Sequence, residues 1–433
     1  MKILKSQNLL IMNVVNSKTP MKRILWLSDY ANSGFGVVAK NLLAEIGRQA
    51  PNLQIDVVAI NFYDEEPLVM FDGRITVMDG RYVESGKLYD QFSRYMFCDL
   101  LIKNPEAYDG VFLLGDISTY TSVIDVMKQT KANNKKINRK SFKSILYTPI
   151  DGNLVKSVFD KSEFFDLIVT YNNYSKGVIG MHRPDLKSKV RIQPHGVSTK
   201  DFFPISKADI ADFRKEFFGA ENADKIIFTN VNRNQPRKSL TTTIFSFIEA
   251  KQINDTGKDI LLYLHCQAND LMGQNLIDII AQTELVIGKD IMIAPDSFWD
   301  KQYGVSIEML NKIYNASDIF ITTTLGEGWG LSVTEAMACR LPTILPQNTS
   351  LIEIGDYGKR CHAIENQYPI CLQDNVIRDS CDALDVAEVM ISAAKQRIKG
   401  TDIKMIDAAE AYVKTLKWDT IAKDFIKYFN DLF

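Results

Sequence analysis

The stretch TTTLGEGWGLSVTEAMACRLPTILP, residues 322–346, decides the fold of the second half of the chain. An apolar segment enters a Gly-rich turn, a helical pattern covers 331–338, and Pro342 ends the helix before another apolar segment. Strand, helix and strand in this order predict a parallel α/β unit. Glu327 and Glu335 stand on either side of seven residues, so the turn and the helix each carry a carboxylate.

The start of this helix suits a phosphate, because unpaired N–H groups and the positive end of the helix dipole attract anions there. Glu335 lies about one turn inside the helix, where it can accept hydrogen bonds from vicinal hydroxyls such as those of a ribose. Glu327, on the turn, can do the same for a sugar. Diphosphate, ribose and hexose together make a nucleotide-sugar. The predicted donor-binding residues also include Gly328, Trp329, Gly330, Leu331 and Ser332.

The segment resembles the donor-binding signature of the retaining glycosyltransferases of family 4, over the whole of EGWGLSVTEAMAC. The resemblance implies the GT-B fold, with two facing Rossmann-like α/β domains, a cleft between them and a C-terminal crossover helix. It also implies that Glu327 holds the transferred sugar and Glu335 the nucleotide ribose. Arg340 stands where the family has Gly. Either it is a cation at a helix C-terminus, or it points into the site as a specificity feature.

The composition indicates a two-domain protein, because the chain has 433 residues and single cores rarely exceed about 250–300 residues. Its 51 basic and 53 acidic residues give a formal net charge of −2. This balance favours no global attraction to nucleic acid or anionic membrane. The six scattered cysteines and the lack of an apolar run of about 18–20 residues predict a cytoplasmic protein without a transmembrane segment.

Short apolar segments alternate with amphipathic ones along the chain, which predicts a parallel α/β architecture. In the first half, the predicted strands are 23–28, 56–61, 110–115, 144–149, 166–171 and 190–194. In the second half, they are 225–231, 259–266, 291–295, 318–324 and 342–346.

The predicted domain boundary lies at HGVSTKDFFP (195–204), whose Gly and Pro suit a hinge loop. Residues 1–20 are expected to form a poorly ordered leader. Residues 21–203 are the expected acceptor-side domain, and 204–415 the expected nucleotide-sugar-binding domain. The amphipathic segment 416–433 is expected to be a terminal helix, which by the family resemblance packs back on the N-terminal domain.

The loop NVNRNQPRKS (230–239) places cations after the first strand of the second half. Arg233 and Lys238 are predicted to neutralise a diphosphate leaving group and to stabilise the charge that develops on it. They are similar to an Arg…Lys-Gly pair of the family, with Ser239 in place of the Gly. Arg237 is interpreted as a surface residue.

The loop SDYANSGFGVVAKNL (28–42) carries Gly34 and Gly36 in a G-x-G-x-x-A spacing after the first strand. Read alone, this spacing predicts a dinucleotide site and a nicotinamide-dependent oxidoreductase. That interpretation expects an acidic residue at the end of the second strand, about 20 residues on. Asp56 instead opens this strand, and Asn61 lies near its end. The family resemblance implies a different use of the loop, toward donor phosphate and acceptor.

Asp151, in YTPIDGN (147–153), is a carboxylate on a turn at a strand end. It is predicted to orient the acceptor hydroxyl or take its proton, and turn formation by its own backbone bonding is the alternative. His195 matches the position before Gly-Val in the family's linker. It is interpreted as a hydrogen-bonding residue that fixes the loop on the acceptor side.

No D-x-D triplet occurs, and the four histidines lack metal-ligand spacing, so neither a metal nor another cofactor is expected. The segment KANNKKINRKSFK (131–143) has six cations and no acid. It is interpreted as a solvated loop. The other hypothesis is an anionic acceptor, a lipid, a phosphorylated glycan or nucleic acid, held by Lys135, Lys136, Arg139 and Lys140.

These features and the family resemblance predict a metal-independent glycosyltransferase that moves a hexose or pentose from a nucleoside-diphosphate-sugar to an acceptor hydroxyl. Retention of configuration is implied by the resemblance alone. Glu327, Asp151, Arg233 and Lys238 are the expected catalytic residues. An oxidoreductase using NAD or NADP at the Gly34 loop and a non-catalytic sugar-nucleotide-binding module are the alternatives. The sequence does not decide the donor base, the acceptor or the oligomeric state.

Overall fold

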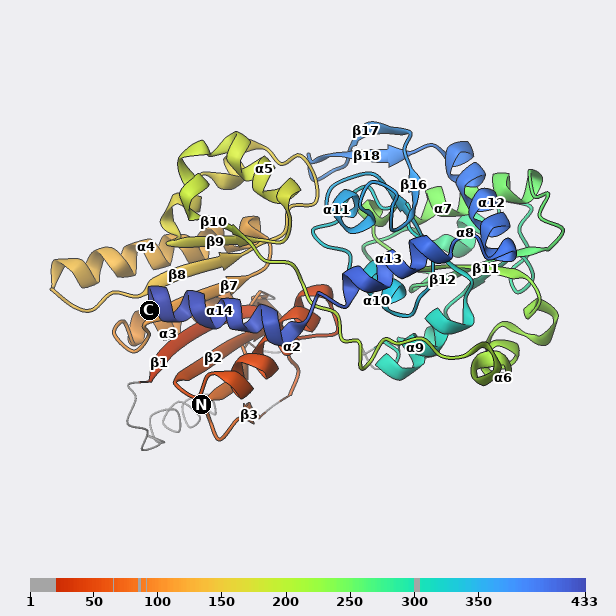
Figure 1. Cartoon of the computed structure of the whole chain (residues 1–433). Helices are drawn as coiled ribbons and strands as arrows, with labels where there is room; N and C mark the ends of the chain where they lie inside the picture. Colours follow the sequence, from red (N-terminus) through yellow and green to blue (C-terminus); the bar gives the residue numbers. More distant parts are fainter. Residues whose placement is uncertain (1–20, 65, 85–86, 91, 300–303) are drawn as a thin grey trace. The chain divides into compact units, whose positions relative to one another are not determined.

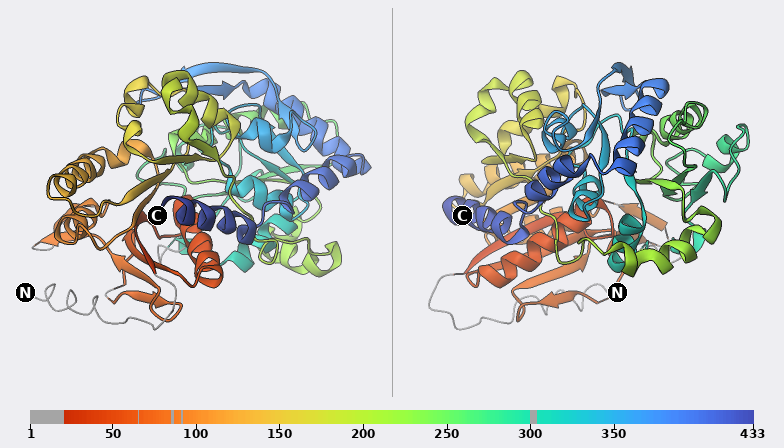
Figure 2. Two further views of the ribbon diagram at one scale, coloured as in Figure 1. Left: turned by 60° about the vertical axis from the view of Figure 1, so that its left-hand side comes forward. Right: turned by 45° about the vertical axis from the view of Figure 1, so that its right-hand side comes forward.

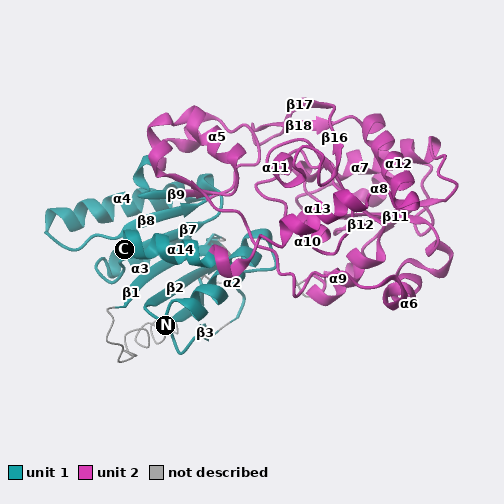
Figure 3. Ribbon diagram, viewed as in Figure 1, with its two compact units in different colours: residues 1–147, 163–167, 422–433 teal, residues 148–162, 168–421 magenta. Residues whose placement is uncertain are grey.

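A computed structural model describes residues 21–433 except 65, 85–86, 91 and 300–303 (Figure 1). The predicted leader, 1–20, lies outside the described residues. The chain divides into two compact units (Figure 3). Unit 1 comprises residues 1–147, 163–167 and 422–433, and unit 2 comprises 148–162 and 168–421. The domain limits expected from the sequence stay a prediction.

Unit 1 is built on a sheet with the strand order β8-β7-β1-β2-β4-β3, parallel except for β3. These strands are β1 (Lys22–Asp29), β2 (Leu53–Ile60), β3 (Leu68–Met70), β4 (Ile75–Asp79), β7 (Gly110–Leu114) and β8 (Lys143–Tyr147). The central strands read as apolar runs, and residues 24–27 of β1 are fully buried. Such runs are typical of parallel strands that are covered on both faces.

The helices of unit 1 are α2 (Gly34–Gln49), α3 (Arg94–Lys103), α4 (Thr121–Lys136) and the last three turns of α14 (Trp418–Leu432). The β5 (Tyr82–Glu84) and β6 (Lys87–Asp90) strands form a separate small hairpin. The last turns of α14 lie along the unit 1 sheet (Figures 1 and 2). Phe425 and Phe429 of this helix pack edge-on against Phe112 of β7, with ring centroids 5.6 Å apart in both pairs. The apolar face of the predicted terminal helix therefore contributes to the unit 1 core.

Unit 2 contains a parallel sheet with the order β13-β12-β11-β14-β15-β16. Its strands are β11 (Ile226–Val231), β12 (Ile260–His265), β13 (Ile291–Ile293), β14 (Ile319–Ile321), β15 (Thr343–Pro346) and β16 (His362–Ile364). One core cluster packs α7 (Leu240–Gln252) and α12 (Ala383–Lys399) on the sheet. A second packs α6 (Lys207–Phe218) and α9 (Ile307–Ala316) on it.

Unit 2 also contains strands and helices outside this sheet. Strands β9 (Leu167–Thr170, from Ile168 on in this unit) and β10 (Val190–Ile192) pair in parallel. Strands β17 (Gln367–Cys371) and β18 (Ile377–Cys381) form an antiparallel hairpin. The remaining helices are α5 (Asn173–His182), α8 (Leu276–Ile280), α10 (Leu331–Ala338), α11 (Leu351–Gly355) and α13 (Ile403–Val413).

Each strand predicted from the sequence is present, and α10 has the predicted bounds. The strands that were not predicted are three to five residues long, and two of them, β3 and β17, are largely exposed, so they differ from the buried apolar runs that mark parallel strands. The interpretation of 131–143 as a loop is wrong for its first part, because α4 continues to Lys136.

Candidate functional site

The predicted donor residues of unit 2 gather where the strand order of its sheet reverses. From β11 the chain adds β12 and β13 on one side, and then β14, β15 and β16 on the other. Strands β11 and β14 pair directly, so the loops after their carboxyl ends are neighbours. In open α/β sheets, ligands bind at such a switch point. These two loops carry the basic segment 233–238 and the turn 326–330.

Glu327 lies at the centre of this region and is 7 % exposed. Its Oε1 accepts a hydrogen bond from Lys238 Nζ at 2.5 Å, and its Oε2 pairs with Arg237 at 3.1 Å. Burial alone would raise the pKa of Glu327, but the charges of Lys238 and Arg237 outweigh it and lower the pKa to about 2. Burial lowers the pKa of Lys238, and Glu327 opposes this shift. The pair is therefore ionised and held in a site that largely excludes water.

Arg237 belongs to this site, and its interpretation as a surface residue is wrong. Its guanidinium also donates to the Gly326 carbonyl and pairs with Asp151 Oδ2 at 3.0 Å. Arg233 is the more exposed cation, at 60 % of its side chain, and pairs with Asp270 at 2.7 Å. The sequence could have indicated Arg237 as a site residue, because it stands next to Lys238. A basic loop residue is, however, usually solvated.

Glu335 has a different environment from Glu327. It is partly buried on α10, and it accepts a hydrogen bond from the Tyr314 hydroxyl of α9 at 2.9 Å. Burial raises the pKa of Glu335 to about 7, and the Tyr314 hydrogen bond opposes the shift. Tyr314 was not predicted from the sequence, where it has the appearance of an apolar helix residue. The two glutamates thus differ in charge near neutral pH.

The turn before α10 needs its glycines for space and conformation. A Cβ on Gly326 would lie 2.1 Å from the Asp151 carbonyl oxygen, and one on Gly328 would lie 2.4 Å from Pro149 Cβ. Gly330, the N-cap of α10, has a φ of 108° and no side chain that could cap the first N–H groups of the helix. Leu331 and Ser332 follow as the first residues of α10. The structure thus has the uncapped helix start that the sequence predicts.

Asp151 lies against this turn, with both of its carboxylate oxygens bound. Oδ2 pairs with Arg237, and Oδ1 accepts a hydrogen bond from Arg378 of β18 at 3.0 Å. Arg378 also donates to the Asp151 backbone carbonyl at 3.1 Å. Arg378 was not predicted from the sequence, where 227 positions separate it from Asp151.

His195 is buried in an aromatic cluster of unit 2. Its ring centroid lies 4.0 Å from that of Tyr171, 5.9 Å from that of Trp329 and 6.2 Å from that of Trp418. Burial lowers the pKa of His195 to about 3, so its imidazole is neutral at physiological pH. This environment suits a packing role for a neutral His195.

Two positions where the resembled signature has Gly keep the backbone conformation that favours Gly. Arg340, after the α10 C-cap, has a φ of 59°, and Ser239, the N-cap of α7, has a φ of 49°. Arg340 pairs with Asp407 at 2.7 Å and with Glu410, both of α13. The side chain therefore joins α10 to α13 and does not enter the site. A left-handed conformation costs a non-Gly residue roughly 1–2 kcal/mol, and these ion pairs act in the opposite direction.

The Gly34 and Gly36 loop lies in unit 1, after β1. Ser33 is the N-cap of α2, and its Oγ accepts the Gly36 N–H at 3.1 Å and donates to Asp29 at 2.8 Å. A Cβ on Gly36 would lie 1.9 Å from the Ala31 carbonyl oxygen. This turn is closed by its own side chains, and Gly36 has a steric reason to be Gly.

The cation-rich segment 131–143 also lies in unit 1, before β8. Lys140 pairs with Asp109, and Arg139 lies 3.9 Å from Glu106. Lys135 and Lys136 are exposed at the end of α4. Since the segment precedes β8, it lies at the amino end of that strand, whereas ligands of parallel sheets bind at the carboxyl ends. The arrangement gives the anionic-acceptor hypothesis no support.

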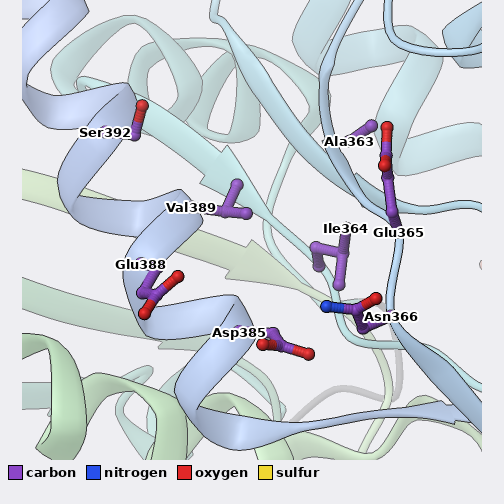
Figure 4. A pocket seen from close by; sticks show the side chains of 8 residues that line it. All are labelled: Ala363, Ile364, Glu365, Asn366, Asp385, Glu388, Val389 and Ser392. Atoms are coloured by element: carbon purple, nitrogen blue, oxygen red, sulfur yellow. The ribbon is translucent and has the colours of Figure 1, made fainter.

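A shallow pocket of unit 2 lies between the end of β16 and α12 (Figure 4). It is lined by Glu365, Asp385 and Glu388 among others, and by none of the predicted donor residues. Within the part of the chain that the structure describes, no three His, Cys, Asp or Glu side chains form a group that could hold a metal ion. Among the same residues, no helix is long and apolar enough to cross a membrane.

Sequence comparisons match parts of this chain to known proteins. Residues 302–378 match the family model of glycosyl transferases group 1. A probable sucrose-phosphate synthase of Thermosipho melanesiensis is 29 % identical over 185 residues, which cover 42 % of this chain and 38 % of that protein. The match thus spans well under half of the relative.

Solved glycosyltransferase structures have the same fold. The sucrose-phosphate synthase of Thermosynechococcus elongatus has a TM-score of 0.68 at 14 % identity, covering 95 % of this chain and 99 % of that one. HepE of Anabaena, in complex with UDP and glucose, has a TM-score of 0.66 at 11 % identity, covering 95 % and 100 %. Starch synthase IV of Arabidopsis thaliana, bound to ADP and acarbose, has a TM-score of 0.65 at 12 % identity, covering 95 % and 99 %. The chain has the GT-B fold expected from the sequence.

Proposed function

We propose that this protein transfers a sugar from a nucleoside-diphosphate-sugar to an acceptor hydroxyl, with retention of configuration and without a metal ion. The observation that carries the proposal is the ionised Glu327 between Lys238 and Arg237, beside the uncapped start of α10. Retention is taken over from the family 4 resemblance. A donor of the UDP-sugar type is supported by the Anabaena HepE structure, whose complex with UDP-glucose also has this fold.

In this proposal, the leaving diphosphate lies at the first N–H groups of α10, with Lys238 and Arg233 as its cationic partners. Fixed charges of this kind stabilise the negative charge that grows as the glycosidic bond breaks. Glu327, ionised and acceptor-only, receives hydrogen bonds from the sugar hydroxyls. Glu335 receives those of the ribose, about one turn farther along α10.

We propose a saccharide hydroxyl as the acceptor. The paired cations at the amino end of β8 do not favour an anionic partner. Two proteins with the same fold are known in complex with saccharides, HepE with glucose and starch synthase IV with acarbose. Asp151, next to the Gly326 turn, is the carboxylate assigned to the acceptor hydroxyl.

A nicotinamide-dependent oxidoreductase is less well supported. The Gly36 N–H that would face a pyrophosphate is already bound by Ser33. Asp56 is buried and paired with Arg23 at 2.7 Å, so it is not available to a ribose, and Asn61 follows the end of β2. The acidic residue with which a dinucleotide site binds the ribose, at the end of its second strand, is therefore missing from β2.

A thermal-shift series tests the donor assignment. UDP-, GDP- and ADP-glucose are compared with NAD and NADP, each at the same concentration, because a ligand that binds only the folded state raises the melting temperature. We expect a shift with at least one sugar nucleotide and none with NAD or NADP. A shift with NAD alone would replace the transferase by the oxidoreductase. Binding without any release of nucleotide from the donor would favour the non-catalytic module.

Metal independence is tested separately by chelation. Donor hydrolysis or transfer is expected to continue in EDTA, because Lys238, Arg233 and the start of α10 take the place of a cation. Loss of activity in EDTA and recovery with Mn²⁺ or Mg²⁺ would show that a metal ion is needed at the diphosphate.

A further inference from the structure

The β17–β18 hairpin of unit 2 holds the loop that carries Asp151. The Asn153 N–H donates to the Ile377 carbonyl at 2.9 Å, which forms an isolated antiparallel bridge between loop and hairpin. A Cβ on Gly152 would lie 2.5 Å from Val376 Cγ1, so the loop and the hairpin are in close contact. The hairpin therefore determines where residues 151–153 lie.

Arg378 makes the central contact of this arrangement and is 4 % exposed. Its guanidinium donates to the Asp151 carbonyl at 3.1 Å, to Asp151 Oδ1 at 3.0 Å and to Asp374 at 2.9 Å. Three donors of one planar group thus bind backbone and carboxylate together. A guanidinium can do this with its fixed geometry, whereas an ammonium group cannot.

The carboxylate of Asp151 is also tied to Glu327. Arg237 binds Asp151 Oδ2 at 3.0 Å and Glu327 Oε2 at 3.1 Å, so one guanidinium joins the two acids. Each carboxylate oxygen can accept two hydrogen bonds. Because each Asp151 oxygen has one guanidinium contact, each keeps one acceptor position for an incoming hydroxyl. Without Arg378, Asp151 would keep Arg237 alone and could rotate about its side-chain bonds.

We propose that Arg378 is a positioning residue, which orients the Asp151 carboxylate beside Glu327 for the acceptor hydroxyl. The inference rests on the proposed transferase function and deepens it. Arg378 touches neither donor nor acceptor in this assignment and acts through Asp151. Its loss is therefore expected to lower turnover while donor affinity stays the same, a split that a general loss of folding does not produce.

The test measures release of UDP from UDP-glucose, in water alone and with glucose or maltotriose as acceptor probes, and the dissociation constant of UDP. In Arg378→Gln, we expect kcat to fall at least about tenfold, with the UDP dissociation constant within about twofold of the wild type. Arg378→Lys is expected to recover part of kcat. In the double variant Asp151→Asn/Arg378→Gln, we expect kcat to lie within about twofold of that of Asp151→Asn alone.

Two further variants separate positioning from folding. Arg214 also binds an aspartate, Asp318, and three backbone carbonyls of unit 2. Arg214→Gln is the matched control, which is expected to lower stability and leave kcat per folded molecule unchanged. Asp374→Asn removes the outer partner of Arg378 from a half-exposed position. Asp374→Asn is expected to lower kcat about two- to fivefold. If Arg378→Gln does not fold, this variant tests the positioning role of Arg378 in its place.

Several results would overturn the inference: kcat of Arg378→Gln or Asp374→Asn equal to that of the wild type, UDP affinity that falls in parallel with kcat, or additive effects in the double variant. The proposed function fails in a different way. If the wild-type protein neither binds nor hydrolyses UDP-, GDP- or ADP-glucose, the transferase assignment is wrong, whatever Arg378 does.

Discussion

Each unit has a glycine-containing turn between a parallel strand and a helix, and the two turns end differently. In unit 1, Ser33 caps α2 and takes the Gly36 N–H. In unit 2, Gly330 begins α10 and provides no side-chain cap. The sequence patterns look equally suited to a phosphate, yet only the second turn begins its helix without a side-chain cap, and its Glu327 pairs with Lys238 and Arg237. A glycine spacing alone does not identify a phosphate site, because a capping side chain can occupy the N–H groups.

The largest effect is expected from the charges at the open turn. In Lys238→Ala, Glu327 loses its closest cation, and turnover should fall at least about a hundredfold. Glu327 then keeps only Arg237 as a cationic partner, and the lost charged hydrogen bond should lower the unfolding free energy by roughly 1.5–3 kcal/mol. Steady-state kinetics and urea denaturation measure the two effects. Lys251→Ala breaks a more exposed ion pair of the same unit, with Asp290, and is the control, with a cost of at most about 1 kcal/mol. Normal turnover in Lys238→Ala would show that the turn before α10 is not part of the donor site.

The next effect concerns pH and Glu335. Because burial raises its pKa to about 7, Glu335 is half protonated near neutrality. Ribose hydroxyls donate to the ionised form, so the affinity for UDP-glucose should rise about tenfold from pH 6 to pH 8. UDP-glucose is the right probe, since its diphosphate does not titrate in this range. Calorimetric titration at both pH values measures the change, and Glu335→Gln should abolish it. A pH-independent affinity in the wild type would contradict the ribose assignment.

Stability should change with pH in the opposite direction. A carboxyl group with a folded-state pKa above its unfolded value binds more protons when folded, so its contribution to stability falls as pH rises from about 4.5 to about 7. The shift corresponds to at most about 3 kcal/mol. Relative to Glu335→Gln, the wild-type protein should therefore lose stability over this window, as measured by urea denaturation at pH 5 and pH 8.

A smaller effect is expected at the closed turn. Ser33→Ala removes the cap of α2 and should lower the unfolding free energy by about 1 kcal/mol. The affinity for UDP-glucose should stay within about twofold of the wild type. Urea denaturation and calorimetric titration provide the two values. Should affinity fall instead, the Gly34 and Gly36 turn takes part in donor binding, and the contrast between the two turns is lost.

The smallest effect, on stability, is expected at a third turn, before α7, which extends the comparison of the two turns. Ser239 adopts a left-handed conformation at this N-cap. Ser239→Gly should therefore stabilise the protein by up to about 1 kcal/mol. Arg340→Gly is its counterpart and should give no such gain, because it also removes the ion pairs with α13. Equal melting temperatures for the wild type and Ser239→Gly would indicate that Ser239 is not strained.

By itself, the sequence determined the order of strands and helices, the bounds of α10 and the placement of Glu327 and Glu335 around its start. These depend on local periodicity, glycine conformation and helix geometry, which act over a few residues. The sequence also determined that Lys238 follows β11, at the end where ligands of a parallel sheet bind.

The tertiary structure alone decided the partners of these groups. Arg237 and Arg378 bind Asp151 from 86 and 227 positions away, Tyr314 on α9 binds Glu335, and α13 binds Arg340. Such contacts have no local signature, because an arginine, a tyrosine or a carboxylate looks the same in sequence whether it is solvated or paired. The packing of distant elements sets the burial and the charges around each group, and these set its pKa and its role.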